Sequence, residues 1–252
     1  MSLREDARTL APRTERSLDA RSVRWLLYSA ALFVPAVLLC DGAGLDRQLM
    51  LGGATAGFLV LAARRTSIDL SQIAIAIAVA TAGELILSVV WGLYSYRFTE
   101  LVPLYVPFGH GLFYLFAAES ARQSWAVRNQ RRIVAGVFLG GSFIAVLGIV
   151  AFRDQWGLLW WIVAAALIAR SANRALVSIC FIYTMLLEWL GTALGNWQWA
   201  AIVPGVGLAS GNPPSGVGLL YVLLDLITIA IWTAARSPLS SLNGARMGSD
   251  PI

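Results

Sequence analysis

The sequence is short of residues that several kinds of chemistry require. It contains no lysine, one histidine and two cysteines. Without lysine no Schiff base can form, which excludes a retinal receptor. A single histidine, His110, excludes an all-histidine metal cluster and an HExxH centre. Cys40 and Cys180 have no CxxC spacing, which favours ordinary membrane packing over a disulfide framework or a thiolate metal site.

Charged residues are also scarce. They make up 13% of the chain, whereas apolar residues make up 58% and the mean hydropathy is +0.70. This composition is far from that of a soluble globular protein and predicts a polytopic membrane protein. The chain carries no Walker or dinucleotide-binding fingerprint, so we predict no cofactor and no metal. A mixed site built from Glu, Asp and His110 stays open.

Eight apolar runs are present, and a membrane-spanning helix needs about 17–25 residues. We therefore expect an all-α bundle of about eight transmembrane helices. Seven spans would result if the marginal second run or the short sixth run entered the bilayer without crossing it. The runs lie at about residues 23–40, 48–63, 70–94, 101–118, 133–152, 156–169, 174–194 and 214–234.

All nineteen basic residues are arginine, and their distribution alternates between loops. The N-terminal segment, the C-terminal tail and the even-numbered loops carry most of them, whereas the odd-numbered loops have only Arg47, Arg97 and Arg153. Positively charged loops stay in the cytoplasm, so both termini of this multi-pass cell-membrane protein should be cytoplasmic and the number of spans even. Topology thus explains the net charge of +5, and we predict no nucleic-acid partner.

Two stretches repeat one phrase within otherwise apolar sequence. Each has a glutamate (Glu84 or Glu188), then Gly-x-aromatic-x-aromatic, Val-Pro and Pro-x-Gly-x-Gly-x-x-Tyr. In both, the glutamate lies on the third predicted helix and the proline-glycine element opens the fourth. This order predicts a duplication into two parallel four-helix repeats, residues 23–118 and 133–235, joined by a basic cytoplasmic loop at residues 119–132. Residues 1–22 and 236–252 are expected to be a flexible cytoplasmic lead and tail.

Three acids, Glu84, Glu188 and Asp225, lie deep within predicted helices. A rise of about 1.5 Å per residue places them roughly 12, 10 and 16 Å from the outer helix ends. An ionisable group in hydrocarbon is costly, so a functional site is the default interpretation, and we take these three as candidate catalytic residues. The structural alternative is that each is a protonated carboxyl that hydrogen-bonds a neighbouring helix and holds the bundle together.

Aromatic and polar residues near the outer helix ends are candidate substrate-binding residues. Rings two residues apart share one side of an extended segment, where they could roof a pocket, although such rings also suit the headgroup zone of a bilayer. The candidates are Trp91, Tyr94, Tyr96, His110, Tyr114, Asn196, Trp197, Trp199, Asn212, Ser215 and Tyr221. Asp41, Glu119 and Asp154 are instead expected to be solvated groups at loops and helix boundaries.

The first phrase supports a family resemblance. Glu84, Trp91-Gly92-x-Tyr94-x-Tyr96 and Val102-Pro103-x-x-x-Pro107 resemble carotenoid-biosynthesis membrane hydratases of the bisanhydrobacterioruberin hydratase type, which are similar in size and number of spans. The match covers chiefly the third and fourth predicted helices. The second block, from Glu188 to Asn212-Pro213-Pro214-Ser215-Gly216, departs from that pattern and leaves the substrate open. A weaker similarity is to small membrane-bound terpene cyclases, which use one acid in an early helix and one in a late helix, as Glu84 and Asp225 would.

Both resemblances imply an enzyme that protonates an alkene or epoxide of a lipid-soluble isoprenoid or carotenoid, followed by hydration or cyclisation. Such chemistry needs a neutral acid, a second carboxylate and aromatic faces that stabilise a cation. We expect Glu84 or Asp225 as the acid and Glu188 as its partner. Two other classes remain open: a proton-coupled transporter or small-molecule carrier, which would also have repeated halves and midplane acids, and a non-catalytic membrane assembly protein.

Overall fold

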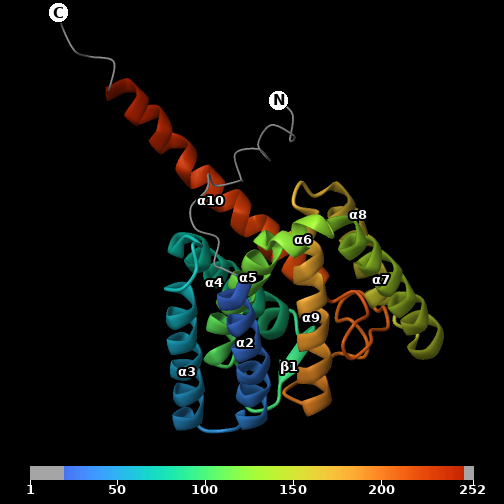
Figure 1. Cartoon of the computed structure of the whole chain (residues 1–252). Helices are drawn as coiled ribbons and strands as arrows, with labels where there is room; N and C mark the ends of the chain where they lie inside the picture. The colour runs from blue at the N-terminus through green and yellow to red at the C-terminus, as the bar shows by residue number, and fades with distance from the viewer. Residues whose placement is uncertain (1–19, 247–252) are drawn as a thin grey trace, which may run out of the picture.

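The computed structural model describes residues 20–246, most of which are helical (Figure 1). The helices are α2 (Ala20–Cys40), α3 (Leu45–Ala63), α4 (Leu70–Glu84), α5 (Tyr105–Arg122), α6 (Ser124–Arg128), α7 (Gln130–Phe152), α8 (Gln155–Arg170), α9 (Arg174–Leu194) and α10 (Leu219–Arg246). A π-helical segment, η1 (Leu85–Val90), continues α4 without a break. All of these except the short α6 correspond to the eight apolar runs, with η1 forming the last part of the third.

The membrane character of the chain is confirmed by helix length and composition. Within the described residues, five helices are long and apolar enough to cross a membrane: Ser22–Cys40, Leu70–Val90, Gln130–Phe152, Arg174–Leu194 and Leu219–Arg236. Helix α8 is apolar but shorter, at 16 residues. Many large apolar side chains on these helices face outward, as a lipid-facing surface requires, including Leu139 (75% exposed) and Val150 (77% exposed). The protein is therefore membrane-embedded.

The long helices run in alternating directions, so the molecule has two distinct ends (Figure 1). We call one the basic end, because it holds the C-terminal ends of α3, α5 and α8, with Arg64, Arg122 and Arg170. The other is the strand end, because two short strands lie there. Helix α2 begins and α10 finishes at the basic end (Figure 1). Which end faces the cytoplasm stays a prediction from the arginine distribution.

The mostly helical fold also contains one short two-stranded sheet. Tyr94–Tyr96 and Trp197–Trp199 form strands β1 and β2, which pair antiparallel with Tyr94 opposite Trp199 and Tyr96 opposite Trp197. These strands are the aromatic-x-aromatic parts of the two repeated phrases. Each follows a glycine in the left-handed conformation that ends the preceding helix, Gly92 (φ 74°) and Gly195 (φ 73°). The extended conformation of both aromatic pairs is confirmed, but their mutual pairing was not expected.

Two predicted segments also differ from the structure. The expected loop at residues 119–132 is mostly helical, because α5 continues to Arg122 and α6 and α7 follow almost at once. The expected flexible tail after residue 235 is helical as far as Arg246. Apart from the start of α2, the expected N-terminal lead lies outside the described residues, as do residues 247–252. The two halves do not form separate bundles, since α10 packs against α4 and α5 packs against α9.

Helix α5 is the central element of the fold. Thirteen of its residues are buried, and it contacts α3, α4 and α9. Gly111 allows the close approach, because a Cβ at this position would collide with Ile77 of α4 and Leu59 of α3. The helix therefore lies inside the bundle, and its polar side chains, His110 and Glu119 among them, face other helices rather than lipid.

Candidate functional site

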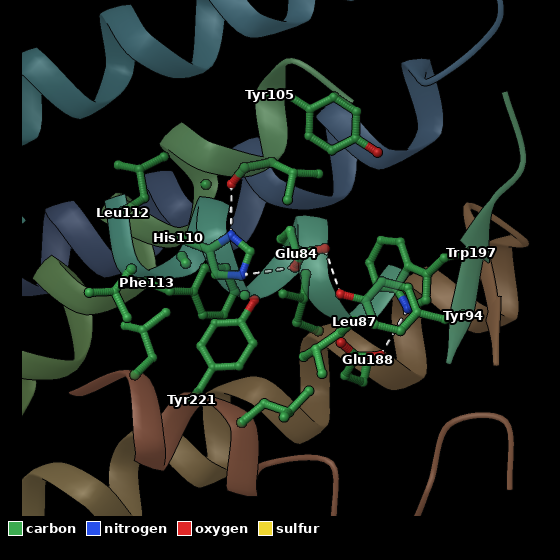
Figure 2. Close-up of a pocket in the computed structure, with 18 of the residues that line it drawn as sticks. Glu84, Leu87, Tyr94, Tyr105, His110, Leu112, Phe113, Glu188, Trp197 and Tyr221 are labelled. Carbon is green, nitrogen blue, oxygen red and sulfur yellow. Dashed lines mark hydrogen bonds and ion pairs between the residues drawn. The ribbon is translucent and has the colours of Figure 1, made fainter. Parts of the chain in front are cut away.

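A cavity of about 510 Å³ lies between α2, α4, α5, α9 and α10, and the paired strands close it at the strand end (Figure 2). Its walls are mostly aliphatic and aromatic side chains, such as Phe33, Leu112 and Phe113. Two carboxyl groups, those of Glu84 and Glu188, are among its lining residues. The volume lies within the range of small-molecule sites, and the lining has the usual combination of apolar walls and few polar groups.

Glu84, at the end of α4, is held by two phenol hydroxyls from β1. Tyr94 Oη donates to Glu84 Oε2 at 2.6 Å, and Tyr96 Oη donates to the same oxygen at 2.7 Å. Residues 94 and 96 point to the same side of the strand, so both rings reach the cavity. Burial, aided by the adjacent Glu84 carboxylate, raises the pKa of both tyrosine hydroxyls above its ordinary value, which keeps them protonated as donors.

The π-helical segment η1 begins directly after Glu84. Its wider turn is visible in the bond from Trp91 N to Ile86 O, five residues back, at 2.8 Å. π-Helical turns often occur at functional sites, because they shift the side chains that follow relative to those that precede. Here the segment brings the chain around so that β1 returns to the carboxyl group at the start of η1. Sequence periodicity did not reveal this irregularity, since every residue of the segment but Ser88 is aliphatic.

His110, on α5, faces the other oxygen of Glu84. His110 Nε2 lies 3.3 Å from Glu84 Oε1, and Nδ1 contacts the Val106 carbonyl oxygen at 2.9 Å. A carbonyl oxygen only accepts, so Nδ1 is protonated and donates a hydrogen bond to Val106 O. One further proton then lies between Nε2 and Oε1, on either the imidazole or the carboxyl group. The ring stacks on Tyr221 of α10, with centroids 5.0 Å apart and planes at 14°, which fixes its orientation.

Glu188, on α9, is held by two indole N–H groups from β2. Trp197 Nε1 donates to Glu188 Oε2 at 2.8 Å, and Trp199 Nε1 donates to the same oxygen at 3.1 Å. Among the described residues no donor contacts Glu188 Oε1, so this oxygen is available to a molecule in the cavity. Gly191 permits the arrangement, because the Trp197 ring occupies the space where a Cβ on Gly191 would be.

The two carboxyl sites have the same local plan. In each, a glutamate near the end of a helix accepts two hydrogen bonds on one oxygen from aromatic residues i and i+2 of the following strand. The donors are phenols in the first site and indoles in the second. The sites also differ in a neighbouring residue. His110 adjoins Glu84, whereas the sequence position equivalent to His110 in the second phrase is Val217, which cannot form a hydrogen bond through its side chain. Duplication of the whole four-helix unit stays a prediction.

The structure brings most of the candidate residues together at this cavity. Its lining includes Glu84, Glu188, Tyr94, Tyr96, His110, Trp197, Trp199 and Tyr221. The rings of Tyr94 and Trp199 lie 4.5 Å apart, and Tyr96 and Trp197 meet edge to face at 6.2 Å. The expectation that the glutamates share one cavity, with the strand aromatics as its roof, thus agrees with the observed geometry.

Six other candidates do not line the cavity. Asp225 is 0% exposed and lies deeper in α10, beside the Cys180 thiol and within electrostatic range of Tyr114. Trp91 Nε1 instead donates to the Pro204 carbonyl oxygen at 2.9 Å. The remaining three act in loop structure, because Asn196 donates to Leu38 O, Asn212 accepts from Trp199 N, and Ser215 N donates to Asp154. Asp225 and Tyr114 are therefore not part of the cavity lining.

Three acids that we expected to be solvated are buried. Asp41 (8% exposed) accepts hydrogen bonds from the Tyr105 hydroxyl at 2.8 Å and from Asn196 at 3.2 Å, tying α5 and the turn before β2 to the end of α2. Asp154 (1% exposed) accepts from the backbone N–H groups of Gly157, Gly211 and Ser215. Glu119 is also only 1% exposed. Loop position gave no signal of this burial, which comes from long-range packing.

Comparison of the chain with protein-family models, with curated proteins and with solved structures found no match.

Proposed function

We propose that the protein is an integral membrane enzyme that protonates an alkene or epoxide of an isoprenoid or carotenoid-like lipid, leading to hydration or cyclisation. The observation that carries this proposal is the pair of glutamates in one apolar cavity, each fixed by two aromatic donors from paired strands. An apolar cavity selects an apolar ligand, and the carboxyl groups and His110 are its main ionisable groups. Such a site suits acid–base chemistry on a hydrocarbon.

The geometry suggests separate roles for the two glutamates. Among the described residues, Glu188 Oε1 has no hydrogen-bond partner and Glu188 has no cationic neighbour in hydrogen-bond contact. We therefore assign Glu188 as the general acid, which reverses the roles expected from the sequence. It transfers its proton to one alkene carbon, whose π electrons form the new C–H bond and leave a carbocation at the adjacent carbon. The His110–Glu84 pair then takes a proton from the water that attacks this cation, and the product is an alcohol. In a cyclisation, the same pair would take the proton that restores a double bond.

The aromatic lining supports a cationic intermediate. Tyr94, Trp197 and Trp199 line the same cavity as both glutamates. Aromatic faces attract cations by about 0.5–2 kcal/mol each, most strongly where water is excluded. The ring positions are fixed by strand pairing and by hydrogen bonds to the carboxyl groups, so they need no reorganisation when charge develops.

The cavity also suits a substrate that arrives from the membrane. Its lining includes outward-facing residues from η1 and α10, namely Ile86 (56% exposed), Leu223 (36%) and Ile227 (44%). These apolar side chains would face lipid, so a hydrocarbon chain can leave the cavity between η1 and α10. A carotenoid-length molecule would then place only its reacting end beside the glutamates. The test is lipid extraction and mass analysis of cells that express the chain in a host producing acyclic isoprenoids.

In that experiment, wild-type cells should contain a lipid that differs from its precursor by one water or by cyclisation. Glu188→Gln and Glu84→Gln should lower its formation by about 10²–10⁴-fold, the usual contribution of a general acid or base. Glu100→Gln is the matched control, because it makes the same change at an exposed loop carboxyl. An identical isoprenoid profile with and without the wild-type chain would reject the enzyme.

A proton-coupled carrier is the second candidate. Two carboxyl groups buried between the cavity and the basic end, those of Asp225 and Glu119, favour it, because acids at such positions often mark proton paths in transporters. Proton-coupled uptake of a lipid or small molecule into liposomes, abolished by Glu84→Gln and Glu188→Gln with no covalent change in the molecule, would select this function.

A further inference from the structure

One polar side chain of the cavity differs from the others in having no partner within the protein. Five aromatic residues of the lining donate a hydrogen bond from a hydroxyl or an indole N–H to a carboxyl group: Tyr94, Tyr96, Tyr105, Trp197 and Trp199. Within the described part of the chain, the hydroxyl of Tyr221 has no such partner, although this residue is only 8% exposed. Buried polar groups are almost always hydrogen-bonded, and water supplies the partner where the protein does not.

The ring of Tyr221 is held in place by α5. It stacks on His110 with centroids 5.0 Å apart, and it contacts Phe113 of the same helix at 5.9 Å. The first turn of α10 also lies close to α9, because a Cβ at Gly218 would collide with an α9 side chain. The hydroxyl therefore points toward His110 and Glu84 in a fixed position (Figure 2).

This hydroxyl also lies near both glutamates of the cavity. Glu188 and Glu84 are each within electrostatic range of Tyr221. Among the described residues, Glu188 Oε1 likewise has no hydrogen-bond partner. A water molecule needs about two to four polar partners to occupy a buried site. Tyr221, the His110–Glu84 pair and Glu188 are such partners, so the apolar cavity has one region that suits water.

We propose that Tyr221 is a third catalytic residue, which binds the water that attacks the carbocation, and that the reaction is therefore hydration. The phenol oxygen accepts one hydrogen of this water, and the His110–Glu84 pair accepts the other. A lone pair of the water oxygen forms the C–O bond, and the hydrogen facing the pair leaves as a proton. That proton balances the one that Glu188 gave to the alkene, so the reaction consumes no net proton. This inference rests on the proposed function.

A bound water decides the fate of the cation. When water is held beside the cation, the C–O bond forms and the product is an alcohol. Without a held water, the cation loses a proton from a neighbouring carbon and returns to an alkene. The ratio of alcohol to alkene therefore measures how well the water is positioned, separately from how fast the cation forms.

The test is product analysis of Tyr221→Phe in lipid vesicles that contain an acyclic isoprenoid, in D2O. The substitution removes only the hydroxyl and keeps the ring that stacks on His110. Total carbon-bound deuterium should equal that of the wild type, because Glu188 still protonates the alkene. The ratio of alcohol to deuterated alkene should fall by at least about tenfold, which corresponds to about 1.4 kcal/mol between the two barriers.

Tyr28→Phe is the matched control, because it removes the same atom from a residue that is 62% exposed and outside the cavity lining. It should give the wild-type ratio. An unchanged ratio in Tyr221→Phe would overturn the proposed role, even if both products fell together, because a merely structural defect lowers both in proportion.

A second measurement needs no substrate. In protein with isotope-labelled tyrosines, solid-state NMR follows the transfer of magnetisation from water to the ring carbon that bears each hydroxyl, and the signal that is absent from Tyr221→Phe identifies Tyr221. Transfer to Tyr221 should be faster than transfer to Tyr105, whose hydroxyl is bound to Asp41 at 2.8 Å. Transfer that is no faster would overturn the water site. Absence of any product from the wild type would instead reject the proposed enzyme, so the two failures are distinguishable.

Discussion

The packing of Trp197 across Gly191 leads to a sharp prediction. A methyl group at position 191 would overlap the Trp197 ring, so Gly191→Ala must displace the indole that donates to Glu188 at 2.8 Å. Overpacking costs about 1–3 kcal/mol and loss of a hydrogen bond to the neutral carboxyl group about 0.5–1.5 kcal/mol, whereas replacing glycine in a helix returns about 1 kcal/mol. We expect a net loss of about 0.5–3.5 kcal/mol, which lowers the Tm by about 1–14 °C.

The assay is thermal unfolding in detergent, with Gly136→Ala as the matched control. Gly136 lies on α7 with open space around its Cβ position, so the same substitution should leave stability equal or slightly higher. Gly191→Ala should also remove the lipid product, because Glu188 loses its alignment. Equal Tm values for Gly191→Ala and Gly136→Ala would refute the packing of Trp197 on α9 and, with it, the positioning of Glu188.

Further expected outcomes follow from individual contacts. Tyr94→Phe and Tyr96→Phe should each lower the free energy of unfolding by about 1–2 kcal/mol. In a double-mutant cycle the two effects should be non-additive, because both hydroxyls bind one oxygen of Glu84. Strictly additive effects would contradict this arrangement. Asp154→Ala should lower the free energy of unfolding by about 3–5 kcal/mol, since three backbone donors lose their acceptor. Chemical unfolding measures this change, and a loss below about 1 kcal/mol would contradict the buried hydrogen bonds of Asp154. Because the pKa of Tyr94 is raised, the contribution of its hydroxyl to stability is present below about pH 10 and is lost as pH rises toward the folded-state pKa. In an ultraviolet titration at pH 10–11, the wild type should therefore show less tyrosinate than Tyr94→Phe plus one ordinary tyrosine.

Local sequence patterns were sufficient for the helices. Continuous apolar runs predicted the approximate bounds of the long helices, and Arg174–Leu194 agrees with the predicted run at both ends. Left-handed glycines at positions 92 and 195 were also predictable, because glycine takes that conformation at low cost. These features depend on residues close together in the chain.

Long-range features were not predictable in the same way. The pairing of β1 with β2 joins segments about a hundred residues apart, and three-residue strands give no periodic signal. Distance along the helix predicted a depth for Asp225 comparable to that of the glutamates. Depth does not determine which face of α10 a residue occupies, and Asp225 lies outside the cavity lining. Likewise, Glu119 beside Arg122 suggested solvation, whereas the central position of α5 buries it.

The most direct test of the central claim, proton transfer from a cavity glutamate to a hydrocarbon, is deuterium incorporation. The purified protein in lipid vesicles would be incubated in D2O with acyclic isoprenoids, and the products analysed by mass spectrometry. The wild type and Glu100→Gln should yield a product with one deuterium on carbon, and Glu188→Gln should yield almost none. Equal carbon-bound deuterium in Glu188→Gln and the wild type, or none in either, would contradict the proposed role of Glu188.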